Sequence, residues 1–174
     1  MSVSLRFAPT SLGRPYTLPQ NAGTLSPAGQ SSVINTYISH DGTANITNSK
    51  FYILPYTGGV YLGATTAQDD YDSILSWGDV SYPAVLGGGL YINQNASGGF
   101  PDSSWDVFRT GHGDSLGNAI TLSANAIISG SAIAGVIQPS TGEAQVRWRI
   151  DIPASHSATG ISYIDTTMYY EATS

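Results

Sequence analysis

The stretch Val146-Arg147-Trp148-Arg149-Ile150-Asp151-Ile152 alternates apolar and polar side chains over its whole length. Successive side chains of a β-strand point to opposite faces of a sheet, so this pattern predicts a strand with one buried and one polar face. Pro153 follows directly and is expected to end the strand, because proline cannot donate to the ladder of backbone hydrogen bonds.

Other short strands are indicated on both sides of this stretch. Residues 33–39 are β-branched and aromatic, and the Asp41-Gly42 pair after them predicts a hairpin with a short strand at 45–47. The nearly continuous apolar run at 51–54 predicts a strand covered on both faces. Further strands are expected at residues 90–93, 119–122, 132–137 and 161–172.

One helix is expected among these strands. Thr66-Ala67-Gln68-Asp69 has the form of a capping box with Asp in place of Glu or Gln. Tyr71, Ile74 and Leu75 share one face at helical spacing, and Gly78 is expected just beyond the last turn. These signals predict a short helix near residues 66–77 in an otherwise all-β chain. The fold class expected is an antiparallel β-sandwich of Ig-like or jelly-roll-like type.

The N-terminal part differs in composition from the rest. Residues 1–32 contain four prolines and many Gly, Ser and Thr residues, without periodicity. We expect an extended N-terminal arm at 1–32, followed by a single β-sandwich domain at 33–174. The arm is interpreted either as a flexible tail or as a segment that docks on a neighbouring subunit.

Charged residues make up only 10% of the chain, against roughly 25% in an ordinary soluble domain. Lys50 is the single lysine, although lysine is a common guard of exposed sheet edges. We therefore expect sheet edges and surface patches to be covered by other subunits, in an assembly with closed symmetry. The net charge of −6 argues against binding to nucleic acid, and no signal peptide or bilayer-spanning stretch is apparent.

The residues that could carry chemistry form no recognised catalytic pattern. Without cysteine, the chain has neither disulfides nor thiolate sites. His40-Asp41 and His112-Gly113-Asp114 could meet in a metal site, but this spacing is more typical of turns. Gly87-Gly88-Gly89 lacks the lysine of a phosphate-binding loop and predicts a loop or a close backbone approach. We expect no catalytic residues, no cofactor and no metal, and hence no enzyme.

Two segments carry a resemblance to known proteins. Residues 146–153, followed by 160–170, resemble the last hairpin of Ig-like sandwiches in microbial surface and virion proteins. Residues 88–95 and 109–115 are similar to structural proteins of tailed bacteriophages. The resemblance implies a non-enzymatic capsid decoration (cement) protein or tail component, assembled in the host cytoplasm and located in the virion. Its expected partners are its own copies, a major capsid protein or a tail protein. Binding to nucleic acid or to a membrane is not expected.

An alternative interpretation rests on the tyrosines and tryptophans. Exposed rings would suit a carbohydrate-binding or receptor-binding module of a phage tail or fibre, whereas buried rings would fill the core or an interface. The candidate partner contacts are drawn from the polar strand face, the arm and one tryptophan, namely Arg147, Arg149, Pro15, Tyr16 and Trp105.

Overall fold

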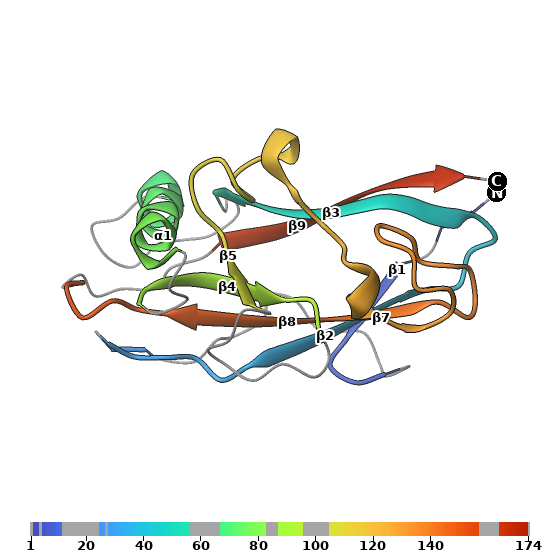
Figure 1. The fold of residues 1–174 in the computed structure, drawn as a ribbon, viewed down its shortest axis with the longest axis horizontal. Helices are drawn as coiled ribbons and strands as arrows, with labels where there is room; N and C mark the ends of the chain where they lie inside the picture. Colours follow the sequence, from blue (N-terminus) through green and yellow to red (C-terminus); the bar gives the residue numbers. More distant parts are fainter. Residues whose placement is uncertain are drawn as a thin grey trace.

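The computed structural model describes residues 2–3, 5–11, 25–26, 28–55, 67–82, 87–95, 105–156 and 164–173. Two antiparallel sheets lie in two layers, with one α-helix at one end (Figure 1). The predicted all-β sandwich is therefore confirmed, with a single α-helix among the residues just named.

The two sheets divide the strands unequally. The six-stranded sheet has the order β1-β2-β8-β4-β5, with β7 paired to a further part of β8. Its strands are β1 (Leu5–Ala8), β2 (Ile34–His40), β8 (Glu143–Asp151), β4 (Gly89–Asn93), β5 (Trp105–Val107) and β7 (Ile127–Ser129). The three-stranded sheet has the order β6-β3-β9, formed by β6 (Ile120–Thr121), β3 (Asn45–Pro55) and β9 (Ile164–Thr173). Helix α1 (Ala67–Ser81) and the short 3₁₀ turns η1 (Leu116–Asn118) and η2 (Ala124–Ala126) complete the described elements.

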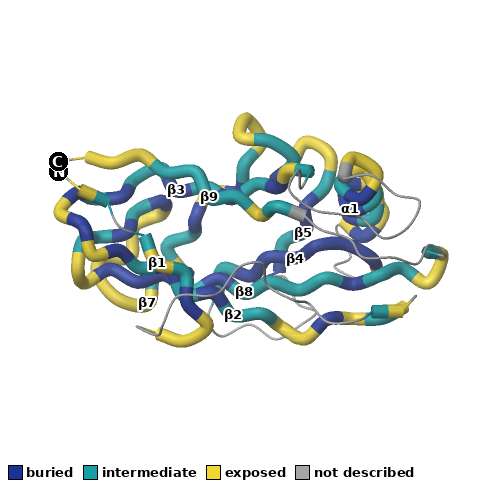
Figure 2. Tube along the Cα trace, turned by 180° about the vertical axis from the view of Figure 1, so that it is seen from behind, coloured by how far each residue is buried: buried dark blue, intermediate teal, exposed yellow. Residues whose placement is uncertain are grey.

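The core lies between the inner faces of the two sheets. Val146 of β8 is fully buried, and Trp148 contacts the core cluster from the same face. The Trp148 ring meets the edge of Phe51 at 5.7 Å and stacks on Phe108 at 6.1 Å between centroids. The alternation that predicted β8 thus places its apolar face inward. Figure 2 shows the buried segments along the strands, with β4 buried over its full length.

The hairpin predicted for residues 33–39 and 45–47 is wrong. β2 pairs with β1 and β8, whereas β3 pairs with β6 and β9, so the turn at 41–44 crosses between the sheets. The N-terminal segment holds this turn, because the Ser2 carbonyl accepts from the Thr43 and Ala44 N–H groups at 3.0 and 3.2 Å. Both sides of β2 are already occupied, which leaves no edge on which β3 could pair.

The predicted burial of both faces of residues 51–54 is also wrong. Phe51 and Ile53 are 2% and 0% exposed, whereas Leu54 is 40% exposed and Tyr52 is half-buried. The segment is an ordinary one-sided strand, because the outer face of the three-stranded sheet reaches solvent at these positions.

The strand predicted at residues 132–137 is in the wrong place. Residues 132–137 form no strand, and only Ile137 makes an isolated bridge, to Ile46. The N–H of Gly135, whose φ is 73°, bonds to the Leu122 carbonyl, so the chain turns where a strand was predicted. The strand of this region is β7, at residues 127–129.

Helix α1 continues past its predicted end. Ile74 and Leu75 face the core as expected, but the helix runs to Ser81 with Gly78 inside it. A Cβ at Gly78 would lie 2.9 Å from the Phe108 carbonyl carbon and closer still to its oxygen. Glycine is thus required here by the close approach of the helix to the chain after β5, not by a helix end. Thr66, the expected cap, lies outside the described residues.

The segment predicted as an arm contributes to the sandwich itself. Leu5–Ala8 forms β1 and pairs with β2 of the same chain, and Gln30 bridges to Asp151. Pro15 and Tyr16 lie outside the described residues. For residues 12–24 the arm therefore stays a prediction.

Candidate interaction surfaces

The outer face of β4, β5 and β8 brings three of the candidate contact residues together. Because β4 lies between the other two strands, Asn93 is opposite both Arg147 and Trp105. Arg147 Nε and Nη2 donate to Asn93 Oδ1 at 3.1 and 2.8 Å, and Nη2 also donates to the Asn95 carbonyl at 2.8 Å. The guanidinium carbon lies 5.4 Å from the centroid of the Trp105 ring. We call Asn93, Trp105, Arg147, Arg149 and Asp151 the outer polar layer.

The second arginine of this layer forms an ion pair. Arg149 Nε donates to Asp151 Oδ1 at 2.7 Å, and the two side chains are 12% and 5% exposed. Burial raises the pKa of Asp151, and the hydrogen bond and charge of Arg149 only partly oppose this shift. A hollow of about 250 Å³ opens beside Asp151, and its other described lining residues are mostly small or apolar.

The hydrogen bonds and the ion pair of the outer polar layer lie within the chain itself. Arg147 and Arg149 share one strand face as predicted, but Arg147 donates to Asn93 of the neighbouring strand β4, and Arg149 donates to Asp151 of its own strand. Trp105 is only 3% exposed and Tyr91 is fully buried, so these rings cannot form an exposed platform for a sugar. Tyr82 is 52% exposed, and the Arg109 guanidinium lies 3.6 Å above its ring centroid.

A separate polar cluster surrounds the turn after β5. His112 Nε2 lies 2.6 Å from Asp106 Oδ2, and Arg109 Nη1 lies 3.5 Å from Asp106 Oδ1. Burial alone would raise the pKa of Asp106, but the hydrogen bond and charge of His112, with the Val107 N–H and Arg109, hold it below its ordinary value. Asp114 accepts from the Gly111 N–H at 2.7 Å and from Asn118 Nδ2 at 2.8 Å. Asp114 closes a turn, as the His-Gly-Asp spacing predicted, whereas Asp106 lies in β5 and binds His112.

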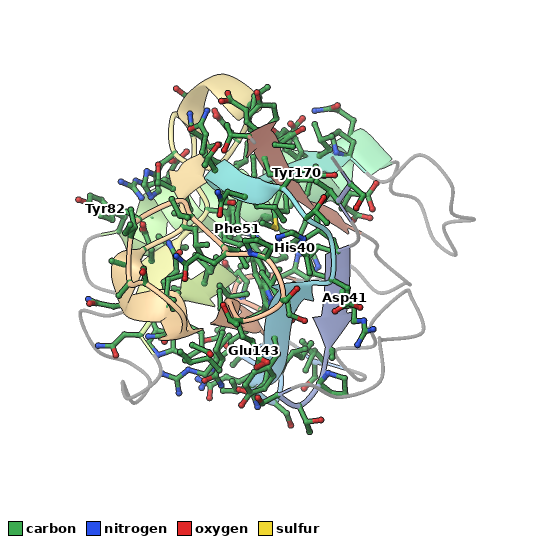
Figure 3. The ribbon with its side chains drawn as sticks, turned by 90° about the vertical axis from the view of Figure 1, so that its right-hand side faces the viewer. His40, Asp41, Phe51, Tyr82, Glu143 and Tyr170 are labelled. Atoms are coloured by element: carbon green, nitrogen blue, oxygen red, sulfur yellow. The ribbon has the colours of Figure 1, made fainter. Side chains whose placement is uncertain are left out.

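His40 lies inside the molecule while Asp41 lies at its edge (Figure 3). His40 Nδ1 accepts from the Gly42 N–H at 3.0 Å, and Nε2 has no hydrogen-bond partner among the described residues. Burial lowers the pKa of His40, against the opposing charge of Asp41 and a backbone hydrogen bond with Ala44. Within the described ranges, no group of three or more His, Asp or Glu side chains is placed to hold a metal ion.

The sheet edges differ sharply in length. β1, β5 and β6 are edge strands of four, three and two residues, and short edges resist pairing with other chains. β9 is an edge strand of ten residues that contains Asp165 and Glu171 but no Lys, Arg or Pro. In Figure 1 it runs along the sandwich to the C-terminus. No strand in the described part of the chain pairs with its second edge.

The sequence predicted poorly guarded edges but did not single out β9. The length of β9 depends on its pairing with β3, which the residue pattern of β9 alone does not reveal.

No protein-family model matches the chain, and a search of curated proteins finds no significant relative. Among the described residues, no helix has the length and apolar character needed to cross a membrane.

Proposed function

We propose that this chain is a non-enzymatic structural subunit of a virus particle, of the capsid-decoration or tail type. It assembles with its own copies, with a capsid lattice, or with both. The observation that carries the proposal is β9, a ten-residue edge strand without lysine, arginine or proline. Such an edge presents unpaired backbone groups and side chains of high β-propensity, which favour the addition of a further strand.

The distribution of charge supports the same function. Few charged residues are present, and several pair with one another, as in the largely buried Arg149–Asp151 pair and the partly exposed Asp106–His112 pair. A surface of hydroxyl and amide groups repels identical copies weakly. Residues 88–95 and 109–115 resemble structural proteins of tailed phages, and this resemblance supports a location in the virion. The glycan-binding alternative gains less support, because Trp105 and Tyr91 are buried.

Sedimentation velocity over a wide range of protein concentrations tests the assembly. A single-strand interface is small, and interfaces below about 1,200 Å² are typical of weak complexes, so the range should extend to high concentration. We expect the wild-type chain to show a reversible shift to a larger species. Tyr169→Lys, on the outer face of β9, should reduce this shift by placing charge at the edge.

Tyr52→Lys is the matched control. Tyr52 lies on the same outer face and is also half-buried, but it belongs to the central strand β3. The control should associate like the wild type. A wild-type chain that stays monomeric at every concentration, and also fails to bind particles, contradicts the proposed function.

The virion location has its own test. Mass spectrometry of purified particles from infected cultures should detect the chain in many copies per particle. Recovery of the chain only from the soluble lysate would contradict this location.

A further inference from the structure

We infer that β9 pairs with β9 of a second copy, antiparallel, about a two-fold axis that passes beside Tyr169. This inference rests on the proposed function and names the partner and the register of its interface. The starting point is that β9 is the long edge strand, whereas β1, β5 and β6 have at most four residues.

Symmetry restricts the registers that two identical strands can adopt. In a two-fold antiparallel pair, side chains directly opposite each other point to the same face, so the axis must pass beside a residue that faces its own copy. For Ile164–Thr173, two registers give the longest overlap. With the axis at Met168, residues 164–172 of one copy pair with the same residues of the other copy. With the axis at Tyr169, residues 165–173 pair in the same way. Each register therefore joins nine residues of each strand.

Charge distinguishes these two registers. With the axis at Met168, Asp165 lies opposite the partner's Glu171, and symmetry repeats this contact on the other side of the axis. Like charges directly opposite each other destabilise a strand pair. With the axis at Tyr169, Glu171 lies opposite the partner's Thr167 and Asp165 opposite the partner's Thr173. The acids of β9 therefore favour the Tyr169 register.

The side-chain directions agree with this arrangement. Met168 and Tyr170 pack against the core of their own chain, and the Tyr169 register places them opposite each other across the axis. The cores of both copies would then lie on one side of a continuous sheet. On the outer face, Glu171 Oε1 accepts from Asn48 Nδ2 at 2.8 Å and from the Tyr169 hydroxyl at 3.1 Å. The bond from Asn48 ties the carboxylate to β3 of its own chain, and the bond from Tyr169 ties it to its own strand.

Disulfide trapping tests the register, because the chain contains no cysteine. A single cysteine can form a homodimeric disulfide only where it meets its own copy, and opposite residues of an antiparallel pair lie within the required distance. Under mild oxidation at a concentration where sedimentation shows association, Tyr169→Cys should form a covalent dimer. Met168→Cys and the control Tyr52→Cys should remain largely monomeric on a non-reducing gel.

A charge variant provides a second test that does not depend on disulfide geometry. Thr167→Lys would face the partner's Glu171 twice in the Tyr169 register, and each opposite-charge pair stabilises a sheet modestly. The dimer dissociation constant should fall roughly two- to thirtyfold. In the Met168 register Thr167 would face the partner's Tyr169, and no such tightening is expected.

The outcomes separate the inference from the proposed function. A dimer that crosslinks through Met168→Cys, or through none of the three variants, overturns the register while assembly remains supported. A chain that associates with neither itself nor particles overturns the proposed function. A chain that binds particles only as a monomer overturns the β9 pairing alone.

Discussion

Arg147→Met tests whether the outer polar layer stabilises the fold or binds a partner. Methionine retains an apolar stem of similar length and removes the guanidinium. The change deletes two bonds to Asn93 Oδ1 and one to the Asn95 carbonyl, together with the contact to the Trp105 ring. Hydrogen bonds that involve a charged group contribute about 1.5–3 kcal/mol each, and such contributions are not additive.

The expected cost is smaller than the sum of these bonds. Asn93 Oδ1 still accepts from the Asn95 N–H at 3.0 Å, so the buried amide oxygen does not lose every partner. We therefore expect the free energy of unfolding to fall by about 2–3 kcal/mol, which corresponds to a decrease in Tm of about 4–12 °C for a chain of this size. Urea and thermal unfolding measure both quantities.

The control is Arg6→Met, because Arg6 pairs with Asp41 where both side chains are about half exposed. Surface pairs of this kind contribute at most about 1 kcal/mol, so stability should change little. Unchanged stability of Arg147→Met together with a loss of self-association would refute the reasoning. Arg147 would then be a partner contact, as the sequence suggested.

Two further predictions concern the helix and the turn between the sheets. Gly78→Ala should lower the free energy of unfolding in urea by about 1–3 kcal/mol, because the new methyl group meets the Phe108 carbonyl. The control Ser76→Ala, on the exposed side of α1, should change it by less than about 0.5 kcal/mol. An increase in stability from Gly78→Ala would contradict this reasoning and show that the helix can move away. Burial lowers the pKa of folded His40, so the folded chain takes up its proton at a lower pH than the unfolded chain, which does so near pH 6.5. Stability therefore decreases as the pH falls through this range. His40→Asn keeps an acceptor for the Gly42 N–H but does not titrate, so its urea midpoint should decline less between pH 7 and pH 5 than that of the wild type; equal declines would contradict this role.

Local patterns predicted the elements whose own residues carry the signal. The alternation around Val146 identified β8 and its inward face, and the helical spacing of Ile74 and Leu75 identified the buried side of α1. Both patterns arise because one face of an element must avoid water, and this requirement is visible within a few residues.

Features that depend on distant parts of the chain were not predictable. The Asp41-Gly42 turn looks like a hairpin turn, but its outcome depends on β1 and β8, which occupy both sides of β2. Gly78 looks like a helix end, but its role depends on the approach of Phe108. The same limit applies to the site, because the bonds that tie Arg147 to Asn93 cross between strands far apart in the sequence.

Hydrogen–deuterium exchange of β9 at several protein concentrations tests the central claim most directly. Backbone amides that point to the free edge exchange quickly in a monomer and slowly when a second copy binds them. In a peptide that covers residues 164–173, we predict exchange that slows as concentration rises, while a peptide from the buried strand β4 exchanges at a constant rate. Exchange in β9 that is independent of concentration, whether fast or slow, would contradict pairing between copies at this edge.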